Sequence, residues 1–138
     1  MIRRLVFVAC LVCCIAFVLI ADLAATVETN KVAVFTETQA TAGKAEYLKT
    51  CATCHTESLI PSAGAKYQGR DIPPLAGPQF MEKWGDLTTR DLTARVKIAA
   101  GEATHVNITA YILQFNGAPA GEHPLTPDTA VEIHAITN

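Results

Sequence analysis

The sequence Cys51-Ala52-Thr53-Cys54-His55 has two cysteines three positions apart and a histidine directly after the second. On one turn of helix, residues three apart lie on the same side, so the two thiols point in one direction. Each thiol can then add to one vinyl group of a porphyrin, and the adjacent imidazole reaches the iron as proximal ligand. The pentad therefore predicts one covalent haem c, attached through Cys51 and Cys54 and ligated by His55.

Two other chemistries also use paired cysteines. A thioredoxin-like thiol oxidoreductase needs a strand before the pair and a βαβ pattern around it, whereas the residues before Cys51 are patterned as a helix. A structural zinc site needs a second pair of ligands at related spacing, and His105, His123 and His134 are too scattered to supply one. An oxidoreductase would be colourless with free thiols, whereas a haem protein would be red with blocked cysteines.

The first 25 residues have the composition of an export segment. Arg3 and Arg4 precede a run of 17 apolar or small residues that starts at Leu5. This order is typical of a secretory signal peptide, and a retained membrane anchor is the alternative because such a run lies at the short edge of a bilayer span. We expect residues 1–25 to be one or the other. The protein is then periplasmic or exported, and is held on the outer face of the inner membrane only if the segment is retained.

Composition sets further limits on function. The chain has 138 residues, room for one domain, and a formal net charge of −2, so it offers no basic face for nucleic acid. Its other cysteines, Cys10, Cys13 and Cys14, lie within the apolar run. Cys51 and Cys54 are too close together to close a useful disulfide loop. A covalently held cofactor would provide the stabilisation that so small a domain often needs.

Two long helices are predicted on either side of the middle of the chain. Thr36 and Gln39 form a T-x-x-Q capping box, which predicts a helix that runs from there into Cys51. Gly43 lies in its middle, where glycine costs about 1 kcal/mol relative to alanine, so we expect another helix to approach closely there. The expected partner runs from about residue 103 to 114, where apolar residues form a stripe.

Aromatic residues follow a proline-rich loop that starts at Arg70. Phe80 and Trp84 are four positions apart on a short predicted helix, so they share one face. Such a pair can cover a flat apolar cofactor, and ordinary packing in the core is the alternative. We expect Phe80 and Trp84 to pack against the haem.

Two more helices are predicted nearer the C-terminus. Thr88 or Thr89 can cap a helix that runs to about Ala100. Thr126-Pro127-Asp128 places proline at the first helical position and predicts a short terminal helix that ends near Ile136. Together these elements predict a small all-α domain of three to five helices around one haem.

Three groups of spaced residues carry a resemblance to a known family. They are Thr36…Gln39…Gly43…Tyr47…Cys51-x-x-Cys54-His55, then Pro73-Pro74-Leu75-x-Gly77-x-x-Phe80-x-x-x-Trp84, then Ala110-Tyr111-Ile112-Leu113-Gln114-x-Asn116-Gly117-x-Pro119-Ala120-Gly121. They resemble a bacterial class I cytochrome c, most similar to the small cytochromes and cytochrome domains associated with quinoprotein (PQQ) alcohol dehydrogenases. The resemblance implies a cytochrome c domain over residues 32–136. It also implies electron transfer between redox proteins, such as a quinoprotein dehydrogenase and a terminal oxidase, rather than enzyme activity.

The chain departs from that family at the second iron ligand. Such cytochromes normally use a methionine on a loop before the last helix, whereas the methionines here are Met1 and Met81 and the loop is very short. Four explanations remain open. The iron is five-coordinate, or His105 is the distal ligand, or Met81 is, or the gene has lost part of the loop.

The choice of ligand decides the function. A six-coordinate iron suits fast one-electron carriage with little rearrangement. An open distal side would instead bind a small ligand such as CO, NO or peroxide, with weak peroxidase activity as a consequence. No distal acid–base pair stands out in the sequence, so we do not predict an enzyme.

Overall fold

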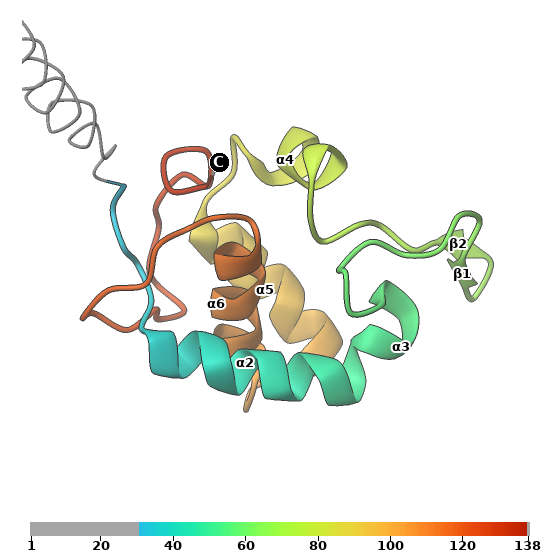
Figure 1. Cartoon of the computed structure of the whole chain (residues 1–138), viewed down its shortest axis with the longest axis horizontal. Helices are drawn as coiled ribbons and strands as arrows, with labels where there is room; N and C mark the ends of the chain where they lie inside the picture. Colours follow the sequence, from blue (N-terminus) through green and yellow to red (C-terminus); the bar gives the residue numbers. More distant parts are fainter. Residues whose placement is uncertain (1–30, 138) are drawn as a thin grey trace, which may run out of the picture. The chain divides into compact units, whose positions relative to one another are not determined.

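Two helices that cross at a glycine form the centre of the fold. The computed structural model describes residues 31–137, and in it α2 (Glu37–Thr50) lies across α6 (His105–Phe115), as Figure 1 shows. A Cβ added at Gly43 would overlap the carbonyl oxygen of Asn107 on α6. The predicted close approach at Gly43 is confirmed, because any side chain there would push the two backbones apart.

The predicted capping box at the start of α2 is also confirmed. The Thr36 hydroxyl accepts the backbone N–H of Gln39 at 3.2 Å, and the Gln39 side chain accepts the backbone N–H of Thr36 at 3.3 Å. The same amide side chain binds the backbone of Leu125, donating to its carbonyl at 2.9 Å and accepting its N–H at 2.8 Å. Gln39 therefore both begins α2 and fastens the C-terminal segment to it.

The described residues are mostly helical. A one-turn helix, α3 (Ala52–His55), follows α2 directly. Next come α4 (Pro78–Trp84) and α5 (Thr89–Ala100), and α5 packs against α6. The cap of α5 is Thr88, whose backbone N–H donates to the Asp91 carboxylate at 2.9 Å. The hydrogen bonds from Thr88 hold the pKa of Asp91 below its usual value.

A small hairpin departs from the all-α prediction. Strands β1 (Lys66–Tyr67) and β2 (Arg70–Asp71) pair antiparallel, where the sequence indicated only a loop. Between them, Gln68 and Gly69 have φ of 51° and 75°. Positive φ at both positions is the signature of the type I′ turn, whose twist matches that of paired strands, and glycine supplies one of the two without strain.

The prediction of a helix that starts at Thr126 is wrong. The C-terminal segment instead runs beside the residues that connect α4 to α5, in extended and turn conformations. Its backbone hydrogen bonds there are Thr89 N–H to Val131 at 2.8 Å, Ile133 N–H to Leu87 at 3.0 Å and His134 N–H to Gly85 at 3.0 Å. Pairing with a segment distant in sequence has overridden the local helix signal.

The core is a single apolar cluster shared by all the longer elements. It joins Phe35, Tyr47, Phe80 and Trp84 to the inner faces of α5 and α6. The predicted export segment, residues 1–25, lies outside the described residues. From residue 31 to residue 137, no helix is both long and apolar enough to cross a membrane.

The crossing gives a first prediction. Gly43→Ala should lower the free energy of unfolding by about 2 kcal/mol. Overpacking costs about 1–3 kcal/mol, a clash with a backbone oxygen lies at the upper end of that range, and the gain in helix propensity returns only about 1 kcal/mol. Chemical unfolding followed by circular dichroism measures it. Ala45→Gly, on the exposed side of α2, is the matched control and reports propensity alone. A Gly43→Ala variant as stable as the parent would contradict the close crossing.

Candidate haem-binding site

The attachment pentad lies at the junction of two helices. Cys51 is the C-cap of α2 and the N-cap of α3, and its carbonyl accepts the N–H groups of Cys54 and His55 at 3.1 and 2.9 Å. Figure 1 shows α3 directly beyond the end of α2. Both cysteines are free thiols and partly exposed. The one-turn helix and its cap therefore present two partly exposed free thiols within one turn of each other.

His55 combines a half-buried ring with an unpartnered nitrogen. Its Nδ1 atom is buried and has no hydrogen-bond partner. Burial lowers the pKa of His55, the backbone carbonyl of Pro73 opposes this shift, and the charge of Arg95 adds to it. The lowered pKa favours the neutral imidazole, which is the form that ligates metals.

These residues fit a covalently attached haem. Two free thiols on one turn match the two vinyl groups, and a neutral imidazole adjoins them. Ligating histidines usually donate their second ring N–H to a carbonyl or carboxylate, and the unpartnered, buried Nδ1 of His55 is free to make such a bond. Cys51 and Ala52 also pack partly against the apolar core, which suits an apolar macrocycle.

Phe80 and Trp84 lie on the buried side of α4. Phe80 is fully buried, and Trp84 is nearly so. Lys83 places its ammonium 5.6 Å from the centre of the Trp84 ring. Both aromatics belong to the cluster that Cys51 adjoins. Their packing against haem stays a prediction.

The Met81 side chain contacts the C-terminal segment. Its sulfur lies 3.5 Å from the hydroxyl oxygen of Thr137. Thr137 is buried, and its hydroxyl donates its hydrogen to the Ile133 carbonyl at 2.8 Å. Ligation by Met81 would require its sulfur to leave this contact with the C-terminal segment.

His105 is the first residue of α6, and its ring is almost fully buried. Nδ1 lies 2.8 Å from the carbonyl oxygen of Glu102, an acceptor, so Nδ1 carries the proton. Nε2 is then the unprotonated nitrogen, and it is buried without a partner. A free lone pair is what a ligand needs, but this atom is closed in by protein. His105 would have to move before it could bind an iron.

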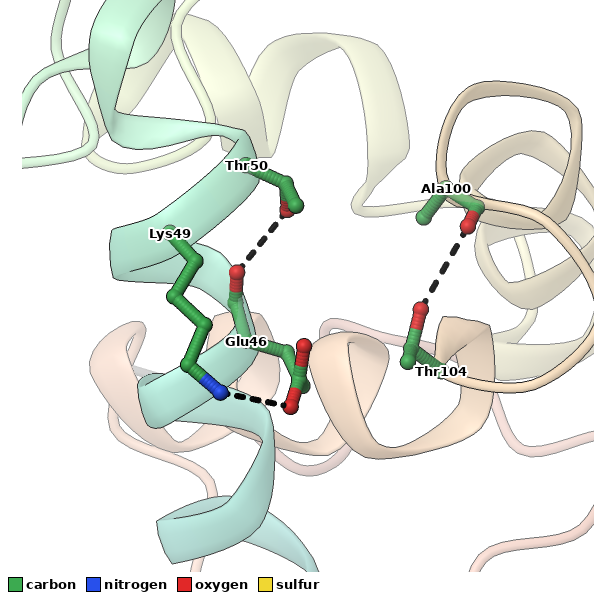
Figure 2. Close-up of polar contacts among 5 residues, drawn as sticks. All are labelled: Glu46, Lys49, Thr50, Ala100 and Thr104. Atoms are coloured by element: carbon green, nitrogen blue, oxygen red, sulfur yellow. Dashed lines mark hydrogen bonds and ion pairs between the residues drawn. The ribbon is translucent and has the colours of Figure 1, made fainter.

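The connection from α5 to α6 is closed by its own contacts. Gly101 ends α5 with φ of 84°, and Lys97 forms an ion pair with Glu102 at 2.5 Å. The Thr104 hydroxyl donates to the Ala100 carbonyl at 3.4 Å, as Figure 2 shows. The same figure shows a separate contact, the Lys49–Glu46 ion pair on the last turns of α2. Residues 101–104 thus form a tight turn rather than a loop that carries a distal ligand.

Two groupings were missed by the sequence analysis. Tyr47 donates from its hydroxyl to the carbonyl of Thr56, at 2.8 Å, which only the folded backbone reveals. At the surface, Asp86, Glu132 and His134 bring ligand-type atoms within 4.8 Å of one another. These three side chains are exposed, and His134 already shares a 3.1 Å contact with Asp86. Because Asp86 is far from the other two in sequence, no motif indicated that the three side chains lie together.

No family model, curated protein or solved structure matches the chain. The resemblance to class I cytochromes c therefore rests on the sequence motifs and remains a prediction.

The attachment chemistry gives a second prediction. In protein made by a host that matures c-type cytochromes, the double variant Cys51→Ala/Cys54→Ala should lose covalent haem, measured by haem staining after denaturing electrophoresis. His55→Ala should keep the thioethers but change the visible spectrum, because the iron loses its proximal ligand. His123→Ala, in the exposed tail, is the control. An unchanged spectrum in His55→Ala would refute proximal ligation by this residue.

Proposed function

We propose that this chain carries one covalent haem c and transfers single electrons in an exported redox chain. The observation that carries the proposal is the pentad at the α2–α3 junction, where two free, partly exposed thiols adjoin a histidine whose Nδ1 is buried without a partner. When bound, the haem supplies a reversible one-electron iron couple. Cys51 and Cys54 would tether it, and His55 would ligate the iron.

The position of the thiols favours electron carriage. Cys51 and Cys54 are partly exposed, so the haem edge that they hold would lie close to the surface. A partner protein could dock there with a short path for the electron. Phe80 and Trp84, buried in the adjoining core, would keep water from the rest of the ring. Redox proteins such as a quinoprotein dehydrogenase and a terminal oxidase are the proposed donor and acceptor.

The matching test is a redox titration. The purified protein should keep its haem through denaturation. In the titration, followed by the visible spectrum, the haem should be oxidised and reduced reversibly, and the ratio of the two forms should depend on potential with the slope of a one-electron couple. A colourless protein with two titratable thiols at Cys51 and Cys54 would contradict the proposal and favour the thiol oxidoreductase.

A second candidate function is binding of a small ligand at an open iron. The observation that favours it is the state of the sixth-ligand candidates: Met81 contacts Thr137, and the free nitrogen of His105 is closed in. The α5–α6 turn is also occupied by its own ion pair and hydrogen bond. With no internal ligand in place, CO, NO or peroxide could reach the iron.

Carbon monoxide distinguishes the two functions. With an open iron, the ferrous spectrum should be high-spin and should shift on addition of CO. A low-spin spectrum that ignores CO would contradict the open site and indicate an internal sixth ligand. The variants His105→Ala and Met81→Leu would then identify it, because only the loss of the true ligand opens the iron to CO.

A further inference from the structure

The residue that follows the attachment pentad has a backbone conformation that belongs to glycine. Thr56 has φ of 59° and ψ of 173°. This region of conformational space is almost confined to glycine, because a Cβ collides with the neighbouring backbone there. Such a conformation persists only where surrounding contacts determine it. The strained residue is bonded directly to His55, so whatever holds Thr56 also bears on the proximal ligand.

Every polar group of Thr56 is held. Its N–H donates to the Ala52 carbonyl at 2.9 Å, which ends α3. Its hydroxyl donates to the Ile60 carbonyl at 2.9 Å and lies 2.8 Å from the Ser58 hydroxyl. These partners are neighbours in the same stretch of chain. The carbonyl of Thr56 accepts the nearby N–H of Leu59 at 3.4 Å, and it also accepts the hydroxyl of Tyr47 on α2, which is its shorter bond and the one that links Thr56 to another element.

Tyr47 reaches the backbone on both sides of the pentad. Its own carbonyl accepts the N–H of Cys51 at 2.8 Å, and its hydroxyl donates to Thr56 at 2.8 Å. The side chain is fully buried, and its ring centroid lies 5.2 Å from that of Tyr111 on α6. Burial raises the pKa of Tyr47 far above its usual value, so the hydroxyl remains a donor throughout the neutral range.

We propose that the Tyr47 hydroxyl is a positioning group that holds Thr56 in its glycine-like conformation and so fixes the direction in which His55 presents its imidazole. The physical reason is the length of α3. A single turn has little rigidity of its own, so its direction depends on anchors at its two ends. At the first end, the N–H of Cys51 makes the last main-chain hydrogen bond of α2, to the carbonyl of residue 47. At the second end, the anchor is the Tyr47 hydroxyl, and the α2–α6 packing holds that side chain in place. This inference rests on the proposed haem attachment.

Three variants test the proposal in the haem-loaded protein. Tyr47→Phe removes the hydroxyl and keeps the ring. Tyr47→Phe/Thr56→Gly adds a residue that takes the same backbone conformation without strain, and Thr56→Gly alone is its reference. Tyr111→Phe is the matched control, because the Tyr111 hydroxyl makes no hydrogen bond within residues 31–137 and is also partly desolvated.

The readout is loss of His55 from the iron at a fixed guanidinium concentration below global unfolding, followed by the visible spectrum. Tyr47→Phe should raise the ratio of unligated to ligated iron about tenfold, the factor expected for one buried hydrogen bond. Glycine at position 56 should restore most of that loss, since the strained conformation no longer needs to be held. Tyr111→Phe should change the ratio little.

Two results would overturn the proposal. In the first, Tyr47→Phe changes the ratio no more than Tyr111→Phe does. In the second, Tyr47→Phe weakens ligation but glycine at position 56 does not restore it, so the hydroxyl acts through general packing. If the parent carries no haem, the proposed function fails separately. In the haem-free chain, Tyr47→Phe should then lower the protection of the residue 56 amide against hydrogen exchange, and adding Thr56→Gly should restore it. If it does not, the proposal is overturned independently of the proposed function.

Discussion

The rest of the structure depends on the absence of a side chain at Gly43. That absence lets the backbone of α2 lie against the backbone of α6 at Asn107. One turn further along α2, Tyr47 meets Tyr111 ring to ring, and one turn beyond that the chain reaches Cys51. The crossing therefore fixes where the residues from Cys51 to His55 lie relative to the core, and α3, which is capped by Cys51 and contains Cys54, begins where α2 ends.

The longer helices could be predicted from sequence because their signals are local. The capping boxes at Thr36 and Thr88 satisfy backbone N–H groups within three residues of themselves, so nothing else in the fold is needed to interpret them. The C-terminal segment shows the opposite case. Proline at position 127 is compatible with a helix, but the backbone of Ile133 and its neighbours bonds to residues nearly fifty positions earlier. No window of local sequence contains that information. The hairpin at residues 66–71 was missed because Gln68 is not a typical residue for positive φ.

In the candidate site, too, local features could be predicted and long-range contacts could not. The grouping of two thiols and an imidazole could be predicted because all three side chains belong to five consecutive residues. The contacts that orient them could not be, because they depend on side chains and backbone angles that only the fold brings together. Tyr47 appears in the sequence as one apolar position of an amphipathic helix, and its hydroxyl bond to Thr56 requires knowledge of where α3 ends. Likewise His105 appeared in the sequence as a residue near a helix start, whereas its burial and the Glu102 contact determine which nitrogen is free.

The two sides of the proposed haem are built in different ways. On the proximal side, α2, α3 and α6 form a frame that is complete without the α5–α6 connection. That connection is itself closed by Gly101, the Lys97–Glu102 ion pair and the Thr104 hydroxyl, so the helical frame needs no longer loop at this point. Under the proposed function, a chain without the loop that brings a distal methionine in class I cytochromes c would still hold His55 in place. The helical frame would hold the haem and its proximal ligand. The short turn would supply no sixth ligand, and the presence or absence of another one would determine whether the iron exchanges only electrons or also binds small ligands.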